Sequence, residues 1–239
     1  MSKCYLCAII IFCFFKTESV AFTIQNQDND DIPSKKQYFL FSTRASVTVP
    51  HPIANSAFKK TFVGIYNINL DFNTFIYRGL YIGASYKNNL FKITPTKIAS
   101  YNVDSLGNLN PYPTMHSNAA AVKVGYDIFI GEENRVIYSI STSVGNYWTK
   151  YGNFVSKPAG KKIIKNSVTS YIEPEMALNF MVESNFAIGV NISYTMLNSN
   201  FDPYKLSLND WKGYGKNNES NTQYLSFGFG FFYSFYKKK

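Results

Sequence analysis

Large apolar residues alternate with small or polar ones along most of the chain after residue 36, and this pattern restricts the fold more than any other feature. Successive side chains of a β-strand point to opposite faces, so a two-residue period predicts strands with one apolar and one polar face. No stretch sustains the 3.6-residue period of an amphipathic helix. Eight segments are expected to be strands, at residues 37–49, 60–72, 74–87, 117–130, 135–148, 168–181, 185–197 and 223–236.

The connections between these segments alternate in length. The short ones read "FNT", "GEEN" and "VESN", whereas the long ones cover residues 50–59, 88–116, 149–167 and 198–222. Short turns at one end and long loops at the other are typical of transmembrane up-and-down barrels, whose tilted strands need about 9–11 residues to cross the bilayer. The fold class predicted for residues 37–239 is therefore all-β, an eight-stranded antiparallel up-and-down transmembrane β-barrel.

The last segment shows most clearly which residues should face lipid. "LSFGFGFFYSF" is aromatic or apolar at every second position and mostly small between. It is expected to pair with residues 37–49, because an open strand edge in lipid is costly. Phe232 would be the one large side chain pointing inward. The outward set is Leu225, Phe227, Phe229, Phe231, Tyr233 and Phe235, and the inward set also holds Gly228, Gly230 and Ser234.

A soluble barrel of the lipocalin type, or a sandwich, is the alternative, with the apolar face turned inward. An eight-stranded barrel has room inside for modest side chains only. The Phe, Tyr, Ile and Leu of the apolar faces would overfill it, whereas the Gly, Ser, Ala and Asn of the opposite faces would fit. Size therefore favours the arrangement with the apolar face outside.

Two positions do not fit a regular strand. Arg78 falls on the apolar face of its segment, so a bulge at Arg78–Gly79 or a snorkelling side chain is expected. Pro174 lies inside another segment, where it removes a ladder hydrogen bond and predicts a local irregularity.

Charged residues on the small and polar faces should lie in the lumen. Buried ions must pair or meet water, so a polar plug that sets strand register is predicted, and a gated or narrow conduit is the alternative. The expected lumen network consists of Arg44, Asp71, Lys123, Asp127, Glu173 and Glu175.

Aromatic residues near the strand ends suit the two membrane interfaces, although the β-propensity of Tyr is a second explanation. The candidates are Tyr38, Tyr86, Tyr147, Trp148, Tyr224 and Tyr236.

The N-terminus has the form of a signal peptide. Lys3 precedes an apolar run within Cys4–Phe15, and Ser19-Val20-Ala21 offers a cleavage site after Ala21. We expect residues 1–21 to be the signal peptide and residues 22–36 a flexible periplasmic segment; a buried N-terminal strand or an uncleaved anchor is the alternative. All three cysteines lie in the apolar run, so the mature chain would have no disulfide framework.

The net charge of +9 is concentrated in the long loops, above all in residues 149–167. A basic surface at that end fits phosphorylated lipopolysaccharide, and a solvated loop is the alternative. No nucleic-acid-binding motif accompanies it. The lysines expected to contact lipopolysaccharide are Lys150, Lys157, Lys161, Lys162 and Lys165.

Catalytic chemistry has weak support. The two histidines, His51 and His116, lie near long loops without an acid at a suggestive spacing. The sequence shows no metal-ligand cluster, phosphate loop or nucleophile elbow, so no catalytic, metal or cofactor site is expected.

The signal-type N-terminus and the stretches "YRGLYIGASY", "FAIGVNISY", "YIEPEMALNF" and "LSFGFGFFYSF" resemble small outer-membrane barrels of the A-domain, X and W types and the porin-family or PorT-like barrels. The resemblance implies an outer-membrane location and insertion by the barrel-assembly machinery. It does not imply a particular substrate. We expect a monomeric, non-enzymatic barrel with outer-membrane lipid and lipopolysaccharide as partners, acting in envelope integrity, adhesion or lipopolysaccharide contact. A narrow solute channel or secretion component is the alternative, and a lipid A-modifying enzyme a minor one.

Overall fold

The computed structural model describes residues 39–77, 79–94, 114–130, 135–155, 162–201 and 221–236. The chain divides into two units, Met1–Lys36 and Gln37–Lys239, and every described residue belongs to the second. The signal peptide and the flexible segment predicted for residues 1–36 lie outside the described residues. The elements are β1 (Phe39–Ala54), α2 (Ser56–Thr61), β2 (Phe62–Tyr77), β3 (Leu80–Ile93), β4 (Thr114–Ile130), β5 (Val136–Val155), β6 (Lys162–Met181), β7 (Phe186–Leu197) and β8 (Gln223–Tyr236).

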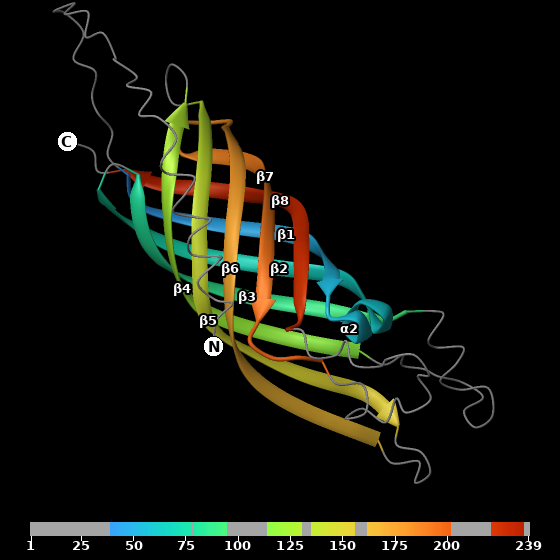
Figure 1. Ribbon diagram of the computed structural model, residues 1–239. Helices are drawn as coiled ribbons and strands as arrows, with labels where there is room; N and C mark the ends of the chain where they lie inside the picture. The colour runs from blue at the N-terminus through green and yellow to red at the C-terminus, as the bar shows by residue number, and fades with distance from the viewer. Residues whose placement is uncertain are drawn as a thin grey trace, which may run out of the picture. The chain divides into compact units, whose positions relative to one another are not determined.

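The eight strands form one closed barrel in sequence order, as predicted (Figure 1). Every neighbouring pair is antiparallel, and β8 returns to pair with β1 from Phe39↔Tyr236 to Ala54↔Gln223. This closure gives the end strands partners for their backbone groups, which a strand in lipid requires. We call the end with the β2–β3, β4–β5 and β6–β7 connections the turn end, and the other the loop end.

The burial pattern places the apolar face outside. Large apolar side chains point outward, with Phe229 72% and Val168 64% exposed, while the small and polar side chains between them are enclosed. In β8, Phe227, Phe229 and Phe231 are exposed as expected. A soluble barrel has the opposite arrangement. The outward position of the apolar face was therefore predicted correctly from the sizes of the side chains.

The turn between β2 and β3 was predicted at the wrong place. Asn73 of "FNT" lies inside the ladder, opposite Gly83, and β2 continues to Tyr77. The chain reverses at Gly79 instead, whose φ of +93° suits glycine and whose absent Cβ leaves room for the Asp127 carbonyl oxygen. The break in the alternation at Arg78–Gly79, which suggested a bulge, is therefore the position of the turn. Arg78 itself lies outside the described residues.

Two other expectations agree with the structure. "VESN" is a short turn, in which the Val182 N–H donates to the Phe186 carbonyl oxygen at 2.9 Å. The β6–β7 register does not shift between Ile172↔Met196 and Glu175↔Ser193, but Glu173 and Pro174 have no partner in this ladder, which is the local irregularity expected at the proline. "GEEN" lies outside the described residues.

The loop end departs most from the sequence-based expectation. Residues 50–54 extend β1, and α2 follows within the segment expected to be a loop. Asn55 caps this helix from a φ of 62°, and its Oδ1 accepts the N–H of Phe58 at 3.0 Å. One and a half turns are too short to show a helical period in the sequence. No helix among the described residues is long and apolar enough to cross a membrane.

Candidate functional site

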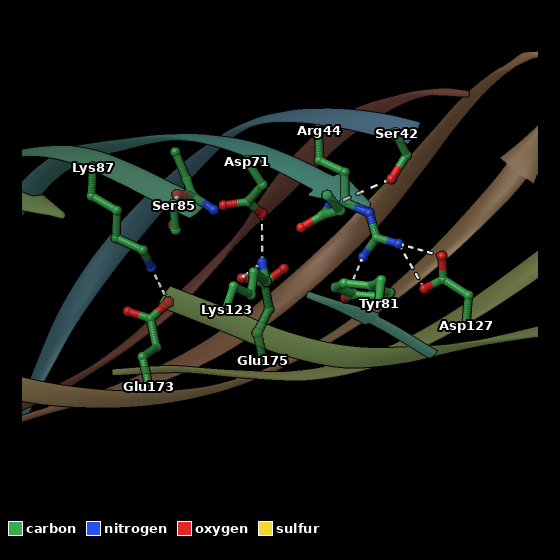
Figure 2. A network of polar contacts seen from close by, with 12 residues as sticks. Ser42, Arg44, Asp71, Tyr81, Ser85, Lys87, Lys123, Asp127, Glu173 and Glu175 are labelled. Carbon is green, nitrogen blue, oxygen red and sulfur yellow. Dashed lines mark hydrogen bonds and ion pairs between the residues drawn. The ribbon is translucent and has the colours of Figure 1, made fainter. Parts of the chain in front are cut away.

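Arg44 and Asp127 form the ion pair nearest the turn end of the lumen (Figure 2). Nη2 of Arg44 donates to both carboxylate oxygens of Asp127 at 2.6 Å, and Nη1 donates to the Tyr81 hydroxyl at 3.0 Å. The guanidinium carbon also lies 4.9 Å from the ring centre of Tyr81 and 5.2 Å from that of Phe232. The charge is thus paired with a carboxylate and lies close to two aromatic rings.

A glycine on β4 makes the position of Tyr81 possible. A Cβ on Gly125 would lie 2.4 Å from the Tyr81 ring and hydroxyl atoms. Narrow barrels fill their interior by combining small with large side chains, and here the small partner is glycine. Gly125 therefore gives Tyr81 its place beside Arg44.

Lys123 forms the middle ion pair and holds two carboxylates. Its Nζ lies 2.5 Å from Asp71 Oδ2 and 3.1 Å from Glu175 Oε2. The three residues come from β4, β2 and β6, on different sides of the barrel. This contact therefore ties strands together across the lumen, which the backbone ladder cannot do.

Lys87 and Glu173 form the third pair, nearest the loop end (Figure 2). The other oxygen of Glu173 accepts the hydroxyl proton of Thr195. Lys87 is not in the expected network, although it is the last residue of the segment 74–87. It lies on the same face as Ser85 and Gly83, so continuing the alternation by one step would have found it.

The structure places all six expected lumen residues inside the barrel and adds Lys87. Among the described residues, three cations therefore meet four carboxylates. None of these seven side chains is more than 8% exposed. We call this group the ion-pair layer.

An apolar cluster lies on the loop side of the ion-pair layer, and we call it the loop-end plug. Phe58 of α2 packs on Phe91 and Phe201, with ring centres 5.4 and 5.9 Å apart. Asn55 ties β1 to the segment after β7, because its Nδ2 donates to the Phe201 carbonyl oxygen at 3.3 Å. The buried members are Ala57, Phe58, Phe62, Phe91, Met115, Ala119, Tyr147, Tyr171, Leu197, Phe201 and Tyr224.

A smaller apolar cluster lies at the turn end. Ile137, Ala187 and Phe232 are fully buried, and Phe129 and Met181 pack against them. The lumen is thus filled in three layers: apolar, ionic and apolar. Water and ions would have to displace packed side chains to pass.

Two of the proposed interface aromatics point into the barrel. Tyr147 and Tyr224 are buried in the loop-end plug, with hydroxyl oxygens 3.3 Å apart. Tyr147 and Trp148 are adjacent in one strand, so only one of them can face outward. Trp148 and Tyr86 do so, at 41% and 47% exposed. The side chains of Tyr38 and Tyr236 lie outside the described residues.

Three of the five lysines expected in a loop at residues 149–167 lie in strands instead, because β5 continues to Val155 and β6 begins at Lys162. Lys150 is exposed on the outer face of β5, and the side chains of Lys162 and Lys165 in β6 lie outside the described residues. Lys157 and Lys161 also lie outside them. His51 and His116 are exposed on β1 and β4, opposite Leu225 and Lys150 respectively. Within the described part of the chain, no His, Cys, Asp and Glu side chains gather in a group that could hold a metal ion.

No protein-family model and no curated protein matches the sequence. The fold is similar to that of Neisserial surface protein A, at 12% identity over 82% of this chain and 97% of the other, with a TM-score of 0.50. Similarity extends to Ail of Yersinia pestis (11% identity, 82% and 97% covered, TM-score 0.46) and OprG of Pseudomonas aeruginosa (10%, 84% and 98%, TM-score 0.44). The similarity to Neisserial surface protein A shows the fold, that of a small eight-stranded outer-membrane β-barrel.

Proposed function

We propose that this protein is a non-enzymatic barrel of the bacterial outer membrane whose lumen is closed and whose loop end makes its contacts. The observation that carries the proposal is the filled lumen, in which the ion-pair layer is enclosed between two packed apolar clusters. The outward apolar face supports a membrane location, because lipid takes the place of the solvent that such a face avoids. Contact with lipopolysaccharide, adhesion and envelope integrity are roles that suit a closed barrel.

Cell fractionation combined with a heat-modifiability gel tests the location. We expect the chain in the outer-membrane fraction and a band that shifts on boiling, because a closed barrel resists unfolding by detergent. A chain recovered in the cytoplasm or free in the periplasm would contradict the proposal.

Lipopolysaccharide contact by residues 149–167 is the second part of the proposal. Its support is the concentration of lysines, of which Lys150 is exposed on the outer face of β5. Replacing Lys150, Lys157, Lys161, Lys162 and Lys165 by Gln should weaken lipopolysaccharide binding and its salt dependence. Binding that stays equally strong and independent of salt would reject this contact.

A narrow channel for small solutes or a part of a secretion system is the second candidate, and the charged side chains of the lumen favour it. Ion currents through the reconstituted barrel separate this candidate from the closed barrel. A lipid A-modifying enzyme is the third, tested by mass spectrometry of lipid A from a deletion strain. For a non-enzymatic barrel we expect the lipid A to be unaltered.

A further inference from the structure

The outer face of β3, β4 and β5 changes character toward the loop end. On β4 the outward side chains are Val122 and Val124 near the middle, followed by Asn118 and His116 near the loop end. Lys92 on β3 and Lys150 on β5 are exposed at a similar level. A basic, polar region therefore directly follows the apolar band on these three strands.

The strand register brings the basic residues together. His116 is the partner of Lys150 across β4–β5, and Lys92 lies diagonally from His116 across β3–β4, opposite Thr114. Side chains directly opposite have Cβ atoms about 4.5–5.5 Å apart, and diagonal neighbours are about 7–8 Å apart. The two lysines therefore flank the imidazole, and their side chains are long enough to reach one ligand.

An oriented amide lies just below the basic residues. Oδ1 of Asn118 accepts a hydrogen bond from Nδ2 of Asn88 at 2.7 Å and another from the Tyr86 hydroxyl at 3.0 Å. These two bonds occupy the oxygen, so the Asn118 amide nitrogen remains as a donor of two N–H groups. Its position is held by two neighbouring side chains on rigid strands.

Aromatic residues mark the level of this region in a membrane. Trp148 is the β5 partner of Asn118, and Tyr86 lies on β3 beside it; both are exposed. Tyr and Trp side chains favour the level of the lipid headgroups. The donors next to them would face the phosphates of the leaflet at the loop end.

The charges around this region favour an anion. In the described part of the chain, the acidic side chains are the four of the ion-pair layer and Glu183 in the β6–β7 turn. The described outer face at the loop end thus carries basic residues without acidic neighbours. Each basic residue near an anionic lipid surface strengthens binding.

We propose that Lys92, His116, Asn118 and Lys150, here called the outer-face patch, bind a phosphate group of lipid A in the leaflet at the loop end. This proposal rests on the proposed function, because that function places the loop end in the leaflet that contains lipopolysaccharide. Ammonium groups and amide N–H groups are donors suited to phosphate oxygens. The patch shares Lys150 with the loop contact proposed above, and its other members lie on β3 and β4 at the edge of the apolar band.

Native mass spectrometry of the full-length barrel refolded in nanodiscs tests this site. The nanodiscs contain phosphatidylcholine with either bisphosphorylated lipid A, lipid A stripped of its phosphates, or phosphatidylglycerol. The barrel should retain the bisphosphorylated lipid A preferentially, and Lys92→Gln/Lys150→Gln should lower its retention about tenfold. The matched control Lys59→Gln/Lys60→Gln removes two exposed lysines from α2 at the same end and should leave retention unchanged.

Four results would overturn the outer-face patch. Equal loss in the two lysine pairs would mean a diffuse charge effect, and equal retention of phosphatidylglycerol would mean no preference for lipid A. Loss on replacing Lys157, Lys161, Lys162 and Lys165 alone would place the contact in the loop and leave the proposed function intact. A wild-type chain that inserts into none of the nanodiscs would contradict the proposed function, and with it the patch.

Discussion

Arg44 illustrates how a charge is kept inside a narrow barrel. Its guanidinium has a carboxylate partner through both oxygens, a hydroxyl partner and two aromatic rings nearby. Removing one member of a buried ion pair costs about 3–5 kcal/mol, because the other charge stays buried alone, whereas replacing both by apolar groups is often neutral. The pair therefore contributes specificity of strand placement more than net stability.

Arg44→Ala should lower the free energy of unfolding by about 3–5 kcal/mol, because Asp127 loses its partner. The double variant Arg44→Met/Asp127→Leu should recover most of that loss. Urea titration of the refolded barrel in lipid vesicles measures both. A single variant as stable as wild type that opened a large steady pore would contradict the structural role of Arg44.

Gly125→Ala should destabilise the barrel by about 1–3 kcal/mol, since the new methyl group would collide with Tyr81. Gly152→Ala is a matched control, because the atom nearest its added Cβ, Thr114 Oγ1, is 3.7 Å away. The same urea titrations compare the two. Equal stability of both variants would mean that Tyr81 is not held against β4.

At the level of elements, α2 and the strand ends make the loop-end plug. The helix presents Ala57, Phe58 and Thr61 to the interior and leaves Lys59 and Lys60 exposed. Its six residues are too few for a stable isolated helix, so packing on Phe91 and Phe201 must hold it in place.

Phe58→Ala should therefore loosen the plug. Truncating a buried Phe costs about 3–5 kcal/mol, and the cavity would lie beside Phe62 and Phe201. Hydrogen exchange of the α2 amides should become faster, while the ladder amides of β4 and β5 stay protected. Lys59→Ala, on the exposed side of the same helix, should change neither. Exchange of the α2 amides that is no faster in Phe58→Ala than in Lys59→Ala would show that α2 does not depend on the plug.

The elements also show where prediction from the sequence stops. Period-2 alternation predicted the strands, the outward face and the inward position of Arg44 and Asp127, because each depends on local geometry. It did not predict that these two residues meet, since the partner across a barrel depends on the stagger of strands far apart in sequence. It also did not predict α2, which is too short to show a helical period, or the inward position of Lys87 at the last residue of its segment.

As a whole, the molecule is a closed barrel, and we propose that its interior is structural and that its exterior makes the contacts. Three layers of side chains fill the lumen, and on β3, β4 and β5 the outer face changes from apolar to aromatic to basic toward the loop end. A lumen closed at both ends cannot serve as a pore without displacing the plug or the ion-pair layer. We therefore expect the lumen to be closed to ions and small solutes.

Current recordings across planar bilayers containing the refolded full-length barrel test closure most directly. We expect no steady open steps from wild-type protein, while Phe58→Ala combined with Arg44→Ala should give brief, irregular openings. Insertion is established in the same preparation by the heat-dependent gel shift. Long-lived, uniform conductance steps from inserted wild-type protein would contradict closure and favour the channel.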